Sequence, residues 1–232
     1  MKYREVEPGV YQIQSFMVKS YALVNSEAIV LIDSGFLGAI SSVDRLLNEL
    51  GREWNDIKAI LLTHGHLDHI HNVAEIKKRS GACVMGTRLD KDHFAQRYRY
   101  KGMSRICGIL EFLGRLLFRF RSFSLDREIA SGQSLELWEG LEVTGLPGHT
   151  LGHVGFYNKS QNILFSGDSH ANFGLRVMRP WPWLNSCPRY FPSSYDKILS
   201  LKPGKIYANH SDRASGEQQM NRFWKAFCRK RR

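Results

Sequence analysis

Residues 60–72 combine the end of an apolar strand with a dense cluster of polar side chains. The run Ala59–Leu62 has the length and bulk of a buried strand, and the helical pattern of Val73–Arg79 follows the cluster. Five side chains that can bind a metal lie between them: His64, His66, Asp68, His69 and His71. Nitrogen and oxygen donors without a thiolate suit zinc or a similar borderline metal. A lone histidine is more often structural, but five donors on one strand-to-helix loop predict a metal site.

Length and composition limit the class of protein. A chain of 232 residues can form one large domain or two small ones, and 43% hydrophobic residues is typical of a globular protein. No apolar run is long enough to span a membrane. Met1–Gly9 lacks the apolar core of a signal peptide, so it is interpreted as mature sequence. Four scattered cysteines predict a reducing, cytoplasmic location rather than a disulfide framework.

The formal net charge of +11 favours anionic partners, namely nucleic acid, acidic lipid headgroups or a negatively charged substrate. Much of the excess is local. Arg88–Arg127 contains ten basic and four acidic residues, and the chain ends in four basic residues, Arg229–Arg232. The terminal run is interpreted as a solvated end.

Apolar patterns predict strands first and then alternating strands and helices. Strands are expected at Gly9–Phe16, Tyr21–Val24, Ala28–Ile32, Ile57–Thr63, Ala82–Met85, Leu135–Trp138, Leu141–Leu146, Val154–Tyr157, Ile163–Ser166 and Lys205–Ala208. Helices are expected at Ser41–Leu50, Val73–Arg79, from Ser193 or Ser194 to Leu201, and at Ser215–Arg229. The segment Arg179–Pro192, rich in proline and tryptophan, predicts an irregular loop.

The segment 88–127 differs in character from the rest of the chain. Helical spacing connects a stripe of apolar residues: Ile106, Ile109, Leu110, Leu113, Leu116, Leu117 and Phe120. Arg105, Arg115 and Arg119 lie off this stripe. One interpretation is an inserted helix packed on the domain. The other is a basic amphipathic helix that covers the active site or touches anionic lipid, with 103–121 as a peripheral membrane contact.

Polar side chains also follow three later predicted strands. His149 and His153 follow one strand, Asp168 and His170 another, and His210 the last. Loops at one edge of a sheet sandwich can converge, so these groups suit a shared rim. Asp33 ends an early strand, either as a turn former or as a carboxylate that orients a ligand.

The segments THGHLDH, PGHTLGH, FSGDS and the late Asn-His pair resemble the metal-binding motifs of the metallo-β-lactamase superfamily. The motifs span Thr63 to His210 in the order that this family shows, so the resemblance covers nearly the whole chain. It implies the α/β class and a four-layer αββα sandwich. Residues 1–232 would then form a single domain, with a basic amphipathic helical insertion at 88–127.

The resemblance also implies the ligand set of a binuclear centre. His64, His66 and His149 would hold one metal, Asp68, His69 and His210 the second, and Asp168 would bridge both. The two divalent ions would be zinc, with manganese or iron as alternatives. A pair of metals lowers the pKa of a shared water, so a bridging hydroxide would be the nucleophile. Asp68 is the candidate catalytic residue that passes a proton to the leaving group.

Three further histidines are candidates to orient a ligand or to face substrate. His71 stands where the family commonly has a glycine, and an orienting or structural role is expected for it. His153 is expected to orient its loop. His170, two residues after Asp168, is expected either to face substrate or to lie on the surface.

The residues also separate branches of the family. The resemblance implies that true β-lactamases lack the aspartate at Asp168, and that flavodiiron proteins have a glutamate in place of His66. Glyoxalase II-like thioesterases append a helical domain, for which the 22 residues after His210 are too few. Quorum-quenching lactonases have a tyrosine where this chain has Ala171. These departures disfavour each named branch to a different degree but leave the hydrolytic chemistry intact.

Three functional hypotheses follow. The leading one is a hydrolase acting on a small ester, thioester or lactone with a hydrophobic or anionic portion. The second is a phosphodiesterase similar to the tRNA-processing nucleases of the family, in which the basic segment Arg88–Arg127 binds phosphates. Against it, that segment is largely apolar, and aromatic and basic residues alternate only in Arg97–Tyr100. The third is a non-catalytic metal-binding or membrane-surface protein. The oligomeric state stays open.

Overall fold

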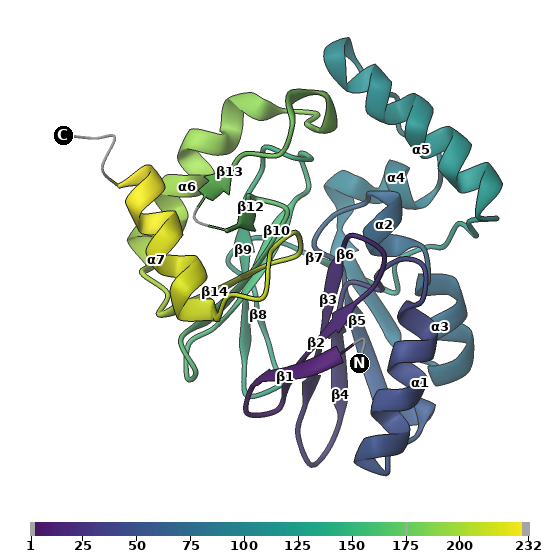
Figure 1. The fold of residues 1–232 in the computed structure, drawn as a ribbon. Coiled ribbons are helices and arrows are strands. Elements are labelled where there is room, and N and C mark those ends of the chain that lie inside the picture. Colours follow the sequence, from purple (N-terminus) through teal and green to yellow (C-terminus); the bar gives the residue numbers. More distant parts are fainter. Residues whose placement is uncertain (1–2, 175, 229–232) are drawn as a thin grey trace.

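The computed structural model describes residues 3–174 and 176–228, and in it two β-sheets face each other between outer helices (Figure 1). The first sheet consists of β1 (Tyr3–Glu7), β2 (Val10–Gln14), β3 (Lys19–Val24), β4 (Ile29–Ile32), β5 (Ile57–Leu61), β6 (Cys83–Thr87) and β7 (Arg127–Ile129), in that spatial order. The second sheet has the spatial order β14 (Lys205–Ala208), β11 (Ile163–Gly167), β10 (Val154–Asn158), β9 (Leu141–Gly145) and β8 (Ser134–Leu135). The basic run 229–232, predicted as a solvated end, lies outside the described residues.

Helices cover both outer faces and one edge of the sandwich. They are α1 (Ala39–Leu50), α2 (Leu67–Ile70), α3 (Val73–Ser80), α4 (Lys91–Phe94), α5 (Arg105–Leu117), α6 (Phe191–Leu201) and α7 (Gly216–Phe227). Single turns of 3-10 helix form η1 (Trp54–Asp56), η2 (Arg88–Asp90), η3 (Gly102–Ser104), η4 (Pro182–Leu184) and η5 (Pro188–Tyr190). A two-stranded ribbon of β12 (Ala171–Phe173) and β13 (Arg176–Met178) precedes η4.

Three apolar layers hold the sandwich together. Alternation along β4 puts Leu31 in the layer under α1 and α3, and Ile32 in the layer between the two sheets. The third layer lies between the second sheet and helices α6 and α7, where Ile198 and Phe223 are fully buried. The predicted four-layer αββα sandwich is therefore confirmed.

The strand directions bring several strand ends to the same edge. β4, β5 and β6 run parallel. In the second sheet β11 is parallel to β14, and β10 is antiparallel to both β9 and β11. Strands β9, β11 and β14 therefore all point the same way, and the residues that follow them share one edge. This edge is where the predicted polar groups lie.

Most predicted elements appear within two or three residues of their expected bounds, and the exceptions are informative. β1 was not predicted because most residues of Tyr3–Glu7 are charged, which is unusual for a strand. In the structure most of them are half-buried. The polar cluster after β5 is only partly a loop, since Leu67–Ile70 form α2, which carries Asp68 and His69. The proline-rich segment contains η4 and η5, and α6 begins at Phe191, with Pro192 in its first turn where proline is tolerated.

Helix α5 carries the predicted apolar stripe, but the stripe does not face the domain. Six members of that stripe are exposed, and only Phe120, beyond the helix end, is buried. The residues of α5 that are buried are Cys107, Glu111 and Arg115. The helix therefore packs on the domain through its polar side, and the predicted apolar stripe stays outward. Among the described helices, none combines the length and apolar character needed to cross a bilayer.

Candidate metal centre

The segment between β5 and α2 supplies four of the predicted donors. His64 and His66 precede α2, while Asp68 and His69 lie within this four-residue helix. The backbone N–H of Thr63 donates to Asp33 Oδ1 at 2.8 Å, and the Thr63 hydroxyl donates to Asp33 Oδ2 at 2.7 Å. Asp33 thus anchors the start of the segment at the end of the parallel strand before it.

The second sheet supplies the other three donors from the ends of its parallel strands. His149 follows β9, Asp168 follows β11 and His210 follows β14. Asp168 Oδ2 lies 3.4 Å from His149 Nε2, 3.4 Å from His69 Nε2 and 3.1 Å from His210 Nε2. This carboxylate therefore lies between donors that come from both sheets.

The seven side chains form three overlapping groups, and in each group the candidate ligand atoms lie within 4.8 Å of one another. The groups are His64, His66 and His149; His64, His69 and Asp168; and Asp68, His69 and His210. His66 Nδ1 and His149 Nε2 are 2.8 Å apart, and Asp68 Oδ2 is 3.4 Å from His210 Nε2. The donors that were far apart in the sequence therefore converge at one rim of the sandwich.

The buried polar atoms at this rim fit a metal. Within the described residues, His64 Nε2, His69 Nε2 and Asp168 Oδ1 are buried and have no hydrogen-bond partner. Unsatisfied polar atoms are costly in a protein interior, and a bound cation would satisfy all three. Burial lowers the pKa of His64 and of His66 well below the usual value, so both imidazoles are neutral and able to bind metal.

On the other side of the centre, carboxylates raise the pKa values of two histidines. Burial lowers the pKa of His210, but the Asp168 and Asp68 carboxylates outweigh it and raise that pKa to about 10. Burial also lowers the pKa of His69, but the carboxylates of Asp168, Asp68 and Asp33 together raise it well above its usual value. In the metal-free protein, these two imidazoles therefore carry protons that a metal must displace.

Two of the residues predicted to orient ligands contact them or their loops. Asp33 Oδ2 lies 2.9 Å from His69 Nδ1 and also accepts from the Asn209 side-chain amide at 2.7 Å. His153 Nε2 accepts the backbone N–H of Asp168 at 2.9 Å, and its Nδ1 lies 3.0 Å from the carbonyl oxygen of Leu146. Contacts of this kind fix the orientation of the groups that bind a metal.

The remaining two histidines lie outside the three donor groups. The half-buried His71 ring packs edge-on against Phe36 and Phe118. His170 is fully buried, with its Nδ1 2.9 Å from the Ser169 hydroxyl and its ring against Phe223. The surface alternative for His170 is therefore wrong, because α7 covers it.

Sequence reasoning missed four side chains that hold the donor loops. Buried Asp90 accepts the N–H groups of Gly65 and Gly152 and the Thr150 hydroxyl, and so joins the loops of His64 and His149. The other three contact the donor segments directly: Glu111 contacts the Leu67 backbone, Asn185 contacts His149, and Asn209 contacts His69. Only Asn209, next to His210, stood in a motif, whereas Asp90, Glu111 and Asn185 reach the site only through tertiary packing.

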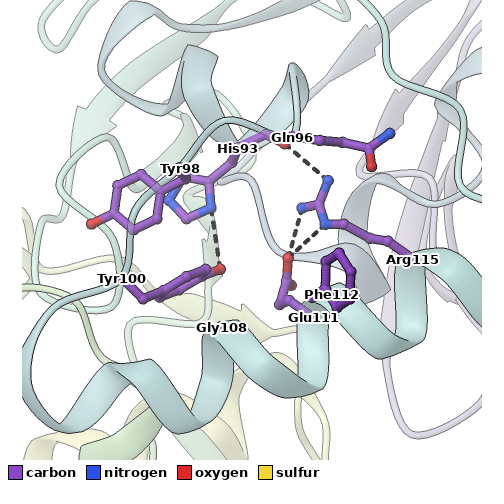
Figure 2. Close-up of a pocket in the computed structure, with 8 residues that line it drawn as sticks. All are labelled: His93, Gln96, Tyr98, Tyr100, Gly108, Glu111, Phe112 and Arg115. Carbon is purple, nitrogen blue, oxygen red and sulfur yellow. Dashed lines mark hydrogen bonds and ion pairs between the residues drawn. The ribbon is translucent and has the colours of Figure 1, made fainter.

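Helix α5 is attached to the donor loop through its polar side. Glu111 Oε1 accepts the backbone N–H of Leu67 at 2.6 Å, between His66 and Asp68 in the sequence. Arg115 donates to Glu111 Oε2 at 2.6 and 2.9 Å, and to the carbonyl oxygens of His93 and Gly65. Figure 2 shows Glu111 and Arg115 pointing together from the helix toward the segment that holds His93.

Two cavities open beside the donors. One of about 300 Å³ contacts Asp168 and His210 and is walled by apolar side chains, among them Trp181 and Trp183, with Arg179 at its lining. The other, of about 210 Å³, lies between α2, α5 and η4 and contacts His66 and Asp68. A mostly apolar cavity with a few polar groups is the usual form of a small-molecule site.

The curated proteins most similar to this chain include two hydroxyacylglutathione hydrolases. The one from Haemophilus influenzae, named GloC, is 30% identical over 146 residues, which are 60% of this chain and 59% of the relative. The one from Bdellovibrio bacteriovorus is 28% identical over 195 residues, or 80% of this chain and 59% of the relative. The chain thus spans about 59% of the length of these two relatives.

Solved structures show the same fold. A metallo-beta-lactamase family protein from Thermus thermophilus superposes with a TM-score of 0.72 at 22% identity, covering 98% of this chain and 81% of that one. A subclass B3 metallo-beta-lactamase of Bradyrhizobium japonicum gives 0.71 at 19% identity, covering 99% and 92%. The family model described as the metallo-beta-lactamase superfamily matches residues 14–210. The chain therefore belongs to the metallo-beta-lactamase superfamily.

Proposed function

We propose that this protein is a binuclear metal-dependent hydrolase of acyl thioesters or esters. The observation that carries the proposal is the convergence of seven histidine and aspartate side chains, from both sheets, in three groups with ligand atoms within 4.8 Å. His64, His66 and His149 would hold one ion, and Asp68, His69 and His210 the other. Asp168, which lies near members of both sets, would bridge them.

The donor set suits zinc, with manganese or iron as alternatives, because it offers imidazole and carboxylate groups and no thiolate. When bound, such a metal pair supplies an activated water near neutral pH and polarises the substrate carbonyl. The chain itself supplies orientation: Asp33 holds the His69 ring, and His153 holds the Asp168 backbone. The half-buried Asp68 lines the cavity beside α5, and we assign it the proton transfer to the leaving group.

The larger cavity indicates the chemistry of the substrate. Its apolar wall would bind an acyl chain next to Asp168 and His210, and Arg179 would attract a negative group. The relatives named hydroxyacylglutathione hydrolase support a thioester within this class. The bond to be cleaved would then be the acyl–sulfur bond, with water adding to the carbonyl carbon and the thiol leaving with a proton.

Two alternatives receive less support. A nuclease of the tRNA-processing type would use Tyr98 and Tyr100 to stack bases, but both rings already pack on His93. A protein that only binds metal would not require the apolar cavity to adjoin Asp168 and His210, as it does here.

A substrate panel tests the hydrolase proposal. Purified protein would be assayed with acyl thioesters, acyl esters, lactones and a phosphodiester, before and after chelation and readdition of each candidate metal. We expect thioester or ester cleavage that chelation abolishes, and about a 10³-fold lower kcat for Asp168→Asn. Glu142→Gln, at an exposed position of β9, is the matched control. Turnover that survives complete metal removal contradicts the proposal.

An acyl-chain series tests the role of the cavity. Each methylene that enters an apolar wall contributes about 0.8 kcal/mol, so kcat/KM should rise about fourfold per carbon until the cavity is filled. Trp181→Ala, which removes an exposed wall residue, should flatten this rise without changing the metal content. An identical chain-length profile for the variant would place the acyl group elsewhere.

A further inference from the structure

Helix α5 has the reverse of the usual arrangement of apolar and polar side chains. Seven large apolar residues of this helix have between 51% and 74% of their surface exposed: Ile106, Ile109, Leu110, Phe112, Leu113, Leu116 and Leu117. The side chains that it buries are Cys107, Glu111 and Arg115. An exposed apolar surface of this extent on a folded protein usually marks an interaction site.

The contacts of the buried side prevent the helix from rotating to hide its apolar face. Glu111 and Arg115 are bound to each other and to backbone groups of Leu67, Gly65 and His93. Gly114 allows close packing, because a Cβ there would come within 2.8 Å of the Leu67 side chain. Rotation would leave a buried ion pair without its backbone partners, so the apolar face stays outward.

Helix α5 lies at the outer edge of the molecule, beyond α2 and α4 (Figure 1). Its exposed apolar face continues onto neighbouring segments. Met103 in η3, just before α5, is exposed, and η4 packs against α5. Trp183 of η4 lines a cavity together with Leu110, and the adjoining Trp181 ring is exposed. Tryptophan beside an apolar helix is typical of surfaces at a membrane–water interface.

The exposed charges of the chain segment that carries this face have one sign. Between residues 93 and 125, the exposed charged side chains are all cationic: Arg97, Arg99, Lys101, Arg105, Arg119 and Arg121. The single acidic residue of this range, Glu111, is buried and paired with Arg115. Cations therefore flank both ends of the exposed apolar helix, and no exposed carboxylate in this range opposes them.

We propose that α5 docks this protein onto the surface of an anionic lipid bilayer. The apolar face would enter the boundary between headgroups and acyl chains, and the flanking arginines and lysine would contact lipid phosphates. A second copy of the chain fits less well, because a symmetric contact through this face would bring two sets of cations together. The docked face would also bring the cavity beside His66 and Asp68 close to the bilayer. Only this last consequence rests on the proposed function.

Vesicle co-sedimentation of the full chain tests the docking without reference to activity. Wild type would be compared on phosphatidylcholine vesicles with and without phosphatidylglycerol, at low and high salt. Leu113→Glu/Leu116→Glu alters the apolar face, and Arg105→Gln/Arg119→Gln/Arg121→Gln alters the charge. The matched controls are Trp224→Gln on α7 and Arg45→Gln/Lys58→Gln/Lys78→Gln, all at exposed positions away from α5.

We expect binding that needs phosphatidylglycerol and weakens with salt. The apolar-face variant should bind at least tenfold more weakly, and the charge variant about fivefold more weakly per cation removed. Both controls should bind like wild type, and circular dichroism and metal content should show that every variant is folded.

Three results would overturn the proposal. The first is no binding of folded wild type to anionic vesicles. The second is binding that both α5 variants retain in full. The third is a wild-type dimer in sedimentation velocity that Leu113→Glu/Leu116→Glu makes monomeric, together with no vesicle binding, which would identify a second copy as the occupant.

Discussion

Helices α1 and α5 have almost the same length and both are amphipathic, yet they face opposite ways. In α1, Val43, Leu46 and Leu47 are buried against the first sheet, as in an ordinary surface helix. In α5, the leucines of the apolar stripe, such as Leu113 and Leu116, are exposed. Apolar periodicity is therefore common to both helices and does not decide which face is buried.

The difference comes from what each helix meets. The inner side of α1 meets an apolar sheet, so burial of its leucines is the favourable choice. The inner side of α5 meets the backbone of the donor segment, where the N–H of Leu67 and the carbonyl oxygen of Gly65 need partners. Glu111 and Arg115 satisfy these groups, so the polar face is the one drawn inward.

The largest expected effect comes from breaking this polar attachment. Glu111→Ala leaves the buried Arg115 charge unpaired and should lower the free energy of unfolding of the metal-free protein by about 3–5 kcal/mol. It should also weaken metal binding by about 10–100-fold, because Leu67 lies between two donors. Urea denaturation and metal titration measure the two effects.

The double variant Glu111→Ala/Arg115→Met separates stability from positioning. Without the stranded charge, the free energy of unfolding should recover much of its loss, while metal affinity should stay low. Recovery of both properties would mean that Glu111 has no positioning role at the donor loop.

A matched pair of leucines on the two helices sharpens the comparison. Leu46→Ala should cost about 2–5 kcal/mol, because it opens a cavity under α1. Leu113→Ala should change the free energy of unfolding by less than about 0.5 kcal/mol, because its side chain is exposed. Equal costs in denaturant titrations would show that the α5 face is covered in solution.

Metal removal should affect the two helices differently. Chelation would remove the two ions proposed for the donor side chains, so α2 and the attached α5 should open more often, while α1 should not. We expect backbone amides of α5 to exchange with solvent roughly tenfold faster after chelation. Hydrogen–deuterium exchange with and without metal measures this, and equal acceleration in α1 would indicate global destabilisation instead.

The last expected effect concerns pH and the two groups of donors. His66, in the loop that α5 contacts, has its pKa lowered by burial, whereas carboxylates raise that of His210 to about 10 despite burial. A metal at Asp68, His69 and His210 must therefore displace protons at pH 7, but one at His64, His66 and His149 need not. The affinity of the site at Asp68, His69 and His210 should therefore rise with pH. For each proton that the metal displaces, the rise should be up to about tenfold per pH unit.

Calorimetric titration in two buffers of different ionisation enthalpy checks this difference. The two binding steps should release different numbers of protons near pH 7, with the larger release on the step assigned to His69 and His210. Equal release on both steps would contradict the assignment of protonated and neutral imidazoles.

Much of the fold and of the candidate site follows from local sequence. Apolar alternation and helical spacing located the strands and helices. The polar residues after the strands included the seven candidate donors that the fold brings together. These features are local: a strand end and the polar residues that follow it are adjacent in the chain. The family motifs then implied how the strand ends meet.

Tertiary structure alone decided the rest. Asp90 and Glu111 carry no local signal, because their partners, Gly152 and Leu67, lie far away in the sequence. Helical periodicity likewise shows that α5 has an apolar face but not where that face points. That direction depends on which surface the helix meets, and here its inner side meets polar backbone groups of the donor segment, which Glu111 and Arg115 satisfy.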